Sequence, residues 1–331
     1  MNGGGIRIRG LLIETESHGS EPGRRLVGPI DIEVIPGTIV GLVGESGSGK
    51  TLTLRALANV LPEGITARDQ DGPLGRIGRT SGKTSGRTAM VFQDPMSFFN
   101  PRRRIARSIG EVLQVVRGVP RHRIPAETTK LLESVNLSAA DGRLFPFEMS
   151  GGMVQRAAIA MALAVEPEVF LADEVTSALD PATRDRILRL ICSVGRRRQA
   201  ATIVVSHDVA SLTDVVDQVI VLYDGIAVEA GNPEVVLRNG RHRYTDLLVR
   251  SLPGENTRGT MLPEMRPKPH HGEEVGSRQA PGCPFASRCP EVLARCHEEL
   301  PPWEGSSEQR YRCFVPVQRT GDPTGVQRDL R

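Results

Sequence analysis

The sequence predicts an α/β domain with a mainly parallel core sheet, and three observations support this prediction. Between residues 38 and 205, short apolar stretches alternate with longer stretches of helical periodicity, which is typical of parallel strands joined by helices. The eight residues GESGSGKT, from Gly44 to Thr51, follow an apolar stretch and precede a helical one. They match the phosphate-binding loop pattern GxxxxGK[ST], which needs this strand–loop–helix context. Polar or charged residues directly follow other apolar stretches, and open α/β sheets bind ligands at such strand ends.

Composition limits the size, compartment and partners of the protein. The 331 residues, 39% hydrophobic and 24% charged, suffice for one large α/β domain with an appendage. A net charge of +3 and 4% aromatic residues give no reason to expect a nucleic-acid partner. No apolar run approaches the roughly 18 residues of a membrane span, and the start of the chain lacks the apolar core of a signal peptide. We therefore expect the chain to stay in the cytoplasm, where structural disulfides are rare.

The first part of the chain predicts antiparallel strands, a buried strand and a helix. Weak apolar–polar alternation in residues 6–35 indicates an antiparallel sheet that leads into the phosphate loop. Thr38–Val43 is apolar and partly β-branched, as in a buried strand. Leu52–Leu61 has helical spacing until Pro62-Glu63-Gly64 stops it. Residues 68–87, rich in Gly, Arg, Ser and Thr, predict an exposed excursion.

The middle of the chain predicts a helical region between strands. Ala89–Phe92 predicts a short strand, and residues 105–135 have helical spacing interrupted by two prolines. Ser150 is a good N-cap for the strongly helical run Met153–Ala164. We therefore expect a helical subdomain at about residues 95–165.

The remaining elements continue the alternation of strands and helices. Asp180-Pro181 opens a helix, with Asp as the N-cap and Pro at the first helical position. A tight turn at Asp224-Gly225 joins the last two strands into a hairpin. The predicted strands are Val169–Ala172, Ala201–Val205, Val219–Tyr223 and Ile226–Glu229.

The phosphate loop predicts a nucleotide site. Its glycines allow backbone amides to converge on phosphate oxygens, and the following helix adds the positive end of its dipole. Lys50 can reach the β- and γ-phosphates, and the Thr51 hydroxyl can ligate Mg²⁺. A Gly/Ser-rich turn with a chance lysine is the alternative, which the flanking strand and helix disfavour. The predicted nucleotide-binding residues are Gly44, Glu45, Ser46, Gly47, Ser48, Gly49, Lys50 and Thr51.

Residues at the ends of the other strands predict the chemistry of this site. Asp173 ends an apolar strand and is expected to order Mg²⁺. Glu174, directly after it, is expected to act as general base on a water in line with the γ-phosphate. Gln93 is expected to hold the same water or the metal, and His207 to hydrogen-bond the γ-phosphate. Each residue alone has an ordinary alternative, such as a structural histidine or a helix-capping acidic pair. All four at strand ends together favour a Mg-ATP site.

The motifs together resemble those of ATP-binding cassette (ABC) ATPases over roughly residues 6–250. Ser150-Gly151-Gly152-Met153 resembles the signature motif, which separates ABC proteins from other P-loop enzymes. The resemblance implies that two such domains pair head to tail, with each ATP between the Walker A loop of one subunit and Ser150, Gly151 and Gly152 of the other. The other matching motifs are Walker A at Gly44–Thr51, the Q-loop at Gln93, Walker B at Phe170–Glu174, the D-loop at Ser177–Asp180 and the switch histidine at His207.

Further residues resemble the dipeptide/oligopeptide/nickel importer branch of ABC proteins. The resemblance implies a peripheral subunit at the cytoplasmic face of the cell membrane, which hydrolyses ATP to power uptake of peptides or a related small solute. Its implied partners are two membrane permeases, an extracytoplasmic substrate-binding protein and a second, often non-identical, ATPase subunit. The matching residues are Val91–Met96 with Asn100-Pro101, and in the tail Pro281–Phe285 with Arg288-Cys289-Pro290.

In this family the region after the Q-loop receives a coupling helix of the permease. For residues 93–114 this implies apolar contacts from Phe98 and Phe99 and polar contacts from Arg102 to Arg104. The alternative is a self-contained helical subdomain with Phe98 in its own core. Two other functions stay open: a soluble ABC ATPase that acts on DNA or the ribosome, and a non-catalytic regulatory P-loop module. Glu174 and His207 disfavour the second of these.

Four cysteines organise the tail of the chain. Near residue 251 the composition changes to a linker rich in Pro, Gly and charge. We therefore divide the chain into an ABC ATPase domain, residues 1–250, and a C-terminal extension, residues 251–331. The extension carries Cys283, Cys289, Cys296 and Cys313, with five, six and sixteen residues between them.

These cysteine spacings predict a metal centre. Zinc knuckles place two to four residues between paired cysteines, whereas longer spacings suit the wider [4Fe–4S] cubane. We therefore expect a [4Fe–4S] cluster, with Zn²⁺ as second choice and four small buried hydrophobic residues as the alternative without metal. Its role is expected to be structural or redox-sensing, because nothing in the sequence ties this tail to the phosphate site.

Overall fold

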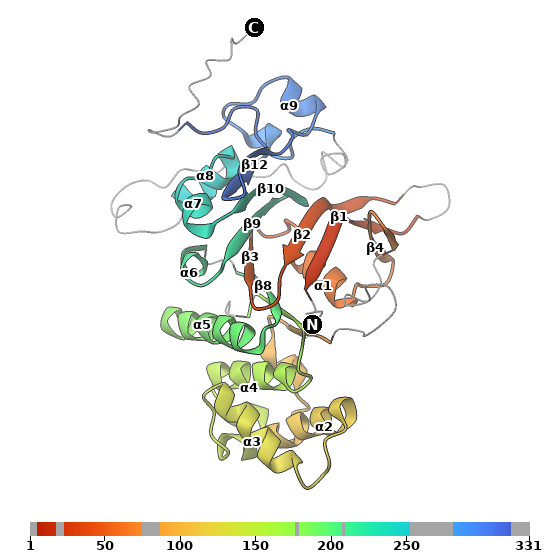
Figure 1. The fold of residues 1–331 in the computed structure, drawn as a ribbon, viewed down its shortest axis with the longest axis vertical. Coiled ribbons are helices and arrows are strands. Elements are labelled where there is room, and N and C mark those ends of the chain that lie inside the picture. The colour runs from red at the N-terminus through yellow and green to blue at the C-terminus, as the bar shows by residue number, and fades with distance from the viewer. Residues whose placement is uncertain are drawn as a thin grey trace.

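We describe the fold from a computed structural model. Its three parts follow one another along the long axis of the molecule (Figure 1). Two β-sheets form the middle, a helical subdomain lies at one end, and the C-terminal segment lies at the other end. The structure describes residues 5–17, 23–73, 87–175, 179–206, 209–251 and 281–318. Within these ranges, no helix combines the length and the apolar character needed to cross a membrane.

The core sheet has eight strands in the order β11-β12-β10-β9-β3-β8-β7-β6. The five strands from β9 to β6 pair in parallel, and the strands on the other side of β9 pair antiparallel. The central strand β3 is fully buried and leads into the phosphate loop, as the sequence predicts. The strands are β3 (Ile39–Val43), β6 (Thr88–Val91), β7 (Val169–Asp173), β8 (Ala201–Val205), β9 (Gln218–Tyr223), β10 (Ile226–Gly231), β11 (Glu304–Gly305) and β12 (Gln309–Tyr311).

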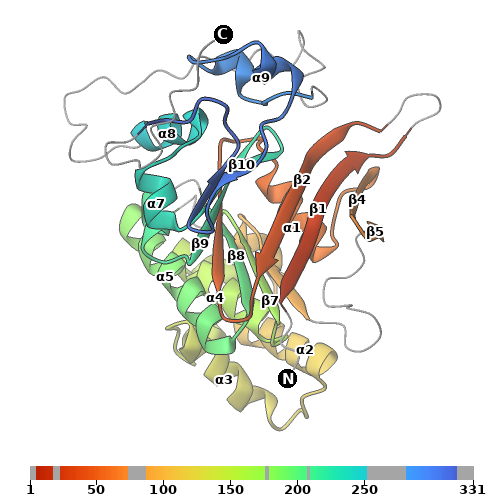
Figure 2. The same ribbon diagram turned by 45° about the horizontal axis from the view of Figure 1, so that its top comes forward.

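A second sheet of four antiparallel strands, in the order β2-β1-β4-β5, covers one face of the core sheet (Figure 2). Its strands are β1 (Ile6–Thr15), β2 (Arg25–Val34), β4 (Ile65–Asp69) and β5 (Gly72–Pro73). Along β2 the side chains alternate between buried and exposed, because one face of this sheet packs on the core and the other faces solvent. The predicted excursion at residues 68–87 starts as the edge of this sheet, and residues 74–86 lie outside the described ranges.

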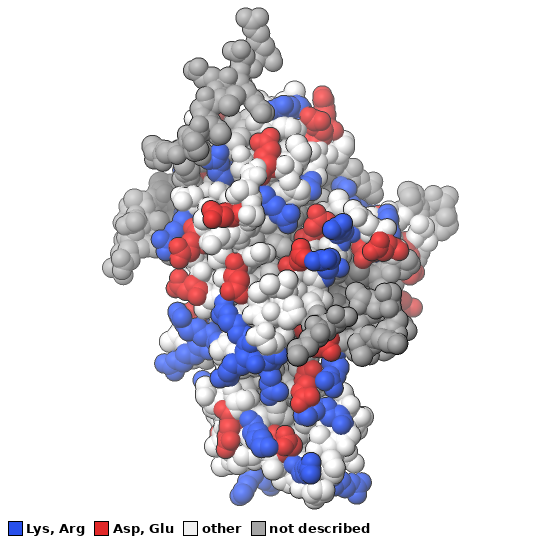
Figure 3. All heavy atoms as spheres, in the orientation of Figure 1, with Lys and Arg blue, Asp and Glu red and all other residues white. Residues whose placement is uncertain are grey.

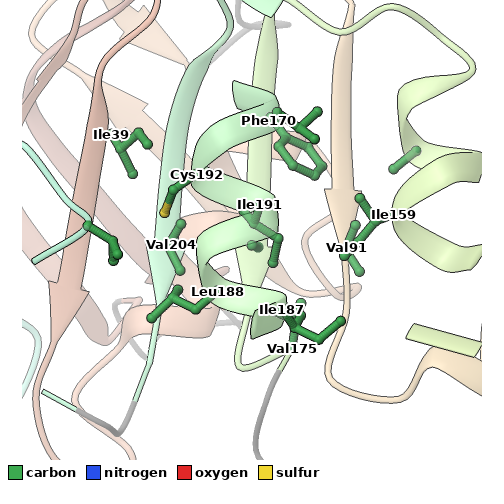
Figure 4. Close-up of a cluster of buried hydrophobic side chains, with 14 of the residues drawn as sticks. Ile39, Val91, Ile159, Phe170, Val175, Ile187, Leu188, Ile191, Cys192 and Val204 are labelled. Carbon is green, nitrogen blue, oxygen red and sulfur yellow. The ribbon is translucent and has the colours of Figure 1, made fainter. Parts of the chain in front are cut away.

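Helices cover both faces of the core sheet. On one face, α5 places a row of apolar side chains over β7 and β8, among them Ile187, Ile191 and Cys192 (Figure 4). On the other face, α1 packs with the four-stranded sheet through Leu54 and Leu57. The helices that follow the phosphate loop and the later strands are α1 (Lys50–Ala58), α5 (Pro181–Arg198), α6 (Val209–Thr213), α7 (Pro233–Arg238) and α8 (Arg243–Arg250).

The ends of α1 and α5 follow from local chemistry. Helix α1 ends at Ala58, three residues before the predicted end, because Asn59 adopts a left-handed conformation (φ 57°) and caps the last carbonyls with its N–H. Asp180 caps α5 as predicted, since its side chain accepts a hydrogen bond from the Thr183 N–H. Lys and Arg side chains gather over α5 on the face shown in Figure 3. The three arginines of its last turn complement the negative end of the helix dipole.

The helical subdomain consists of three helices and short 3₁₀ turns between β6 and β7. Helix α4 packs against α2, α3, α5 and the turn η1, so it joins the subdomain to the sheet. Ser150 caps α4 as predicted, since its side chain accepts from the Met153 N–H. The elements are η1 (Pro95–Phe98), α2 (Ile105–Arg117), α3 (Ile124–Ser134), η2 (Asp141–Arg143), η3 (Pro146–Glu148) and α4 (Gly151–Leu163).

The C-terminal segment, residues 281–318, shares the hydrophobic core of the eight-stranded sheet. Strand β12 pairs with β10 and so continues the core sheet, because β10 otherwise presents an unpaired edge. Phe285 is fully buried, and its ring centroid lies 5.2 Å from that of Tyr223 and 5.6 Å from that of Tyr244. The segment also contains η6 (Ala286–Arg288) and α9 (Arg295–Glu298).

Candidate nucleotide-binding site

The phosphate loop lies at the carboxyl end of β3 and continues directly into α1. Gly44 and Gly49 have φ values of 149° and 99°, in the region that favours glycine. A Cβ atom at Gly44 would collide with the carbonyl oxygen of Leu222, and one at Gly49 would collide with the Val27 side chain. The two glycines therefore allow the loop to pass close to the ends of β2 and β9.

Lys50 and Thr51 are held at the mouth of this loop. Lys50 is 3% exposed, and its Nζ donates to the carbonyl oxygens of Gly44 (2.9 Å) and Glu45 (2.8 Å). The Thr51 hydroxyl donates to Oδ1 of Asp173 at 3.1 Å. The structure thus joins the loop to the end of β7, as the sequence predicts.

Asp173 and Glu174 differ in their surroundings although they are adjacent. Asp173 is 5% exposed, and burial raises the pKa of its carboxyl group, while the hydrogen bond from Thr51 acts in the opposite direction. Glu174 adopts a left-handed backbone conformation (φ 48°), and its N–H donates to the Val205 carbonyl at 3.2 Å. Such a conformation costs a non-glycine residue about 1–3 kcal/mol, and strained backbone of this kind recurs at active sites. Nothing in the local sequence indicated this conformation.

Of the other predicted site residues, the structure places Gln93 near Asp173 and Ser150, Gly151 and Gly152 at a helix start, and it does not describe His207. Gln93 follows β6 and is exposed, and β6 pairs with β7 so that Val91 lies opposite Ala172. Gln93 therefore lies near the same strand end as Asp173. Ser150, Gly151 and Gly152 form the start of α4, which packs against Leu179 and Thr183. His207, together with Ser177 of the predicted D-loop, lies outside the described residues.

The C-terminal segment contacts the phosphate loop. The Arg288 guanidinium donates to the Glu45 carboxylate at 2.9 Å, and the Glu45 N–H donates to the Tyr244 hydroxyl at 2.8 Å. The tail therefore contacts the phosphate site, although nothing in the sequence ties the two together. The two residues of the ion pair are 243 positions apart in sequence, and no local pattern marks Arg288 as a partner of Glu45.

The four cysteines of the tail line one small cavity of about 20 Å³. Burial raises the pKa of the Cys283 thiol to about 12, and it also raises the pKa of Cys289 and Cys313. Among the residues that the structure describes, no three side chains of His, Cys, Asp or Glu are arranged to hold a metal ion. The lining residues include His242, Cys283, Phe285, Cys289, Cys296 and Cys313.

Comparisons with known proteins agree with this geometry. The sequence matches the ABC transporter family over residues 27–177, and the family described as oligopeptide/dipeptide transporter, C-terminal region, over residues 228–296. It is 36% identical over 303 residues to the probable peptide ABC transporter ATP-binding protein y4tR of Sinorhizobium fredii, covering 87% of this chain and 88% of the relative. It is 34% identical over 302 residues to the probable D,D-dipeptide transport ATP-binding protein DdpD of Escherichia coli, covering 87% and 90%.

A solved structure confirms the fold. The structure of cbiO1 from Clostridium perfringens, part of the ABC transporter complex cbiONQ, is similar at a TM-score of 0.57 and 20% sequence identity. The match covers 70% of this chain and 92% of that chain. The predicted P-loop α/β architecture with an antiparallel N-terminal sheet is thereby confirmed.

Proposed function

Since this chain belongs to the ATP-binding proteins of peptide ABC transporters, we propose that it hydrolyses ATP to power the uptake of peptides or related small solutes. The observation that carries the proposal is the hydrogen bond between Thr51 and Asp173, which joins the phosphate loop to the strand end that carries Glu174. The alternative of a soluble ABC ATPase acting on DNA or the ribosome loses support, because the relatives named above are transport proteins.

The residues around the loop fit Mg-ATP. Bound Mg²⁺ supplies positive charge that neutralises the phosphate oxygens. Lys50 would exchange the carbonyl oxygens of Gly44 and Glu45 for phosphate oxygens, and Thr51, Asp173 and Gln93 would supply oxygen ligands to the metal. Glu174 accepts a proton from the attacking water, and His207 orients the γ-phosphate.

A second ATPase subunit completes each site in this proposal. Ser150 and Gly151 are exposed at the start of α4, where backbone N–H groups and the helix dipole favour an anion. We assign this surface, with Gly152, to the γ-phosphate held by the partner subunit, which we take to be a non-identical paralogue.

Two membrane permeases and an extracytoplasmic substrate-binding protein complete the proposed complex, which places this chain at the cytoplasmic face of the membrane. The permease contact is assigned to the segment after Gln93. Within it, Phe98 is half-buried, and its ring is tilted against that of Phe92 with the centroids 5.6 Å apart. Met96 is 41% exposed. Phe99 is 5% exposed and belongs to the core. The expectation that Phe99 supplies contact area was therefore wrong, and Met96 takes its place.

Cysteine crosslinking tests this assembly. Arg103→Cys, expressed together with the two permeases, is expected to crosslink to a permease, because Arg103 lies within the proposed docking segment, residues 93–114. Glu133→Cys, on the exposed face of α3, is the matched control and is expected to give no such product. As a second measurement, we expect the chain to co-purify with both permeases from detergent-solubilised membranes. A permease crosslink from Glu133→Cys but none from Arg103→Cys would contradict the docking site.

We further propose that the four cysteines of the extension, residues 251–331, hold a [4Fe–4S] cluster, and that residues 1–250 form the ATPase domain. Four thiols around one cavity are a suitable donor set for such a cluster. At about 20 Å³ the cavity has room for about one water molecule. Cluster binding therefore requires the four thiols to move apart.

Metal analysis of anaerobically purified protein tests the cluster. We expect brown protein with broad absorption near ~400 nm and about four irons per chain. Cys289→Ala is expected to lose this absorption, whereas Cys192→Ala, in the core of the ATPase domain, is expected to keep it. Colourless protein with stoichiometric zinc would favour Zn²⁺, and metal-free wild-type protein would leave four buried thiols as the remaining interpretation.

A further inference from the structure

Glu45 of the phosphate loop is held from outside the loop by residues of the C-terminal half of the chain. We propose that Arg288 is a positioning residue for the phosphate loop, so that ATP affinity depends on the docked C-terminal segment. This inference rests on the proposed function, because it assigns a further residue to the same ATP site.

Arg288 is fixed between the segment and the loop. Its side chain is 6% exposed, and the Glu45 side chain is 19% exposed, so solvent screens this ion pair weakly. Besides Glu45, the guanidinium donates to the Tyr223 hydroxyl at 2.8 Å and lies over the rings of Tyr223 (5.6 Å) and Phe285 (5.9 Å). Burial raises the pKa of Tyr223 to about 12, so this partner stays a neutral hydroxyl.

A second series of contacts links Glu45 to the cysteine cavity through Tyr244 and His242. The Tyr244 hydroxyl accepts from the Glu45 N–H at 2.8 Å, and the Tyr244 N–H donates to Nδ1 of His242 at 3.1 Å. Because Nδ1 accepts, the proton of this buried neutral ring lies on Nε2, which is 3.7 Å from the Cys283 sulfur. Arg288 itself directly precedes Cys289. These two contacts of Glu45, with Arg288 and with Tyr244, are therefore each linked to a cysteine of the cavity.

The charge of Glu45 explains why its partner matters for ATP. The loop must receive a triphosphate of several negative charges, and Glu45 adds a partly buried carboxylate to the same loop. Arg288 neutralises that carboxylate and fixes its position. Removal of Arg288 takes this cation away from a partly buried carboxylate, so the carboxylate repels the phosphates more strongly and holds the loop less firmly. ATP binding should weaken more than the turnover of bound ATP, because Arg288 acts on the loop through Glu45 and not through Glu174, the assigned general base.

Three variants of the full-length chain test this role. Arg288→Gln is expected to raise the Kd of a fluorescent ATP analogue and the KM for ATP by roughly tenfold, with kcat changed less than about threefold. Arg288→Lys keeps the charge and should recover part of the affinity. The double variant Glu45→Gln/Arg288→Gln removes both charges and should bind more tightly than Arg288→Gln alone.

Arg295→Gln is the matched control. Arg295 lies on α9 of the same segment, is exposed and stacks over Phe314 at 3.9 Å, so its loss should leave Kd unchanged. Thermal melting of each variant reports whether it is folded. Wild-type affinity in folded Arg288→Gln would overturn the inference, as would a double variant that binds no better than the single one. Failure of the wild-type chain itself to bind ATP would instead overturn the proposed function.

Discussion

Replacing Glu174 with Gln is expected to leave ATP binding intact and to slow ATP hydrolysis by about 10²–10⁴-fold, the contribution of a general base. Glutamine keeps the size of the side chain but cannot accept a proton at neutral pH. The backbone hydrogen bond from residue 174 to the Val205 carbonyl is independent of the side chain, so the strand end should keep its geometry.

Two measurements on the same preparation separate binding from chemistry. Nucleotide affinity should match that of the wild type, while phosphate release under saturating ATP should fall. Glu133→Gln makes the same chemical change on the exposed face of α3 and should leave both quantities unchanged. Wild-type turnover by Glu174→Gln would remove Glu174 from the catalytic assignment.

Replacing Phe285 with Ala is expected to lower the free energy of unfolding by about 3–5 kcal/mol, the usual range for a buried phenylalanine. Phe285 is fully buried between Tyr223, Tyr244 and His242, so truncation leaves a cavity at the junction of the C-terminal segment and the core sheet. The midpoint of urea unfolding, followed by far-UV circular dichroism, measures the loss.

Phe147→Ala is the control for this substitution. Phe147 is 66% exposed on η3, so its truncation should change the free energy of unfolding by no more than about 0.5 kcal/mol. An equal and small effect of the two substitutions would show that the C-terminal segment unfolds separately from the ATPase domain.

Local patterns account for most of what could be predicted from the sequence. The strand that feeds the phosphate loop, the capping of α5 by Asp180 and the hairpin at Asp224-Gly225 each depend on a few neighbouring residues. Thr51 and Asp173 are far apart in sequence, but each carries a motif that implies its place at the carboxyl ends of parallel strands. Their contact could therefore be expected from the topology.

The features that could not be predicted depend on contacts between segments that are far apart in sequence and carry no motif. The pairing of β12 with β10 and the ion pair between Arg288 and Glu45 leave no periodicity or spacing in the sequence. The burial of Phe99 beside the half-buried Phe98 depends on how η1 turns against α4. The sequence shows whether such a residue is polar or apolar, but it does not show which distant residue it contacts.

The ion pair between Glu45 and Arg288 also sets an order of events during synthesis. The phosphate loop leaves the ribosome early, and Arg288 follows 243 residues after Glu45. At about 5–20 residues per second, this separation corresponds to tens of seconds. During that interval the nascent ATPase domain has its phosphate loop without the partner of Glu45 and has an open edge at β10. The contact of Glu45 with Arg288 and the pairing of β10 with β12 can therefore form only after the C-terminal segment has been synthesised, and a truncated product that ends before residue 281 lacks both.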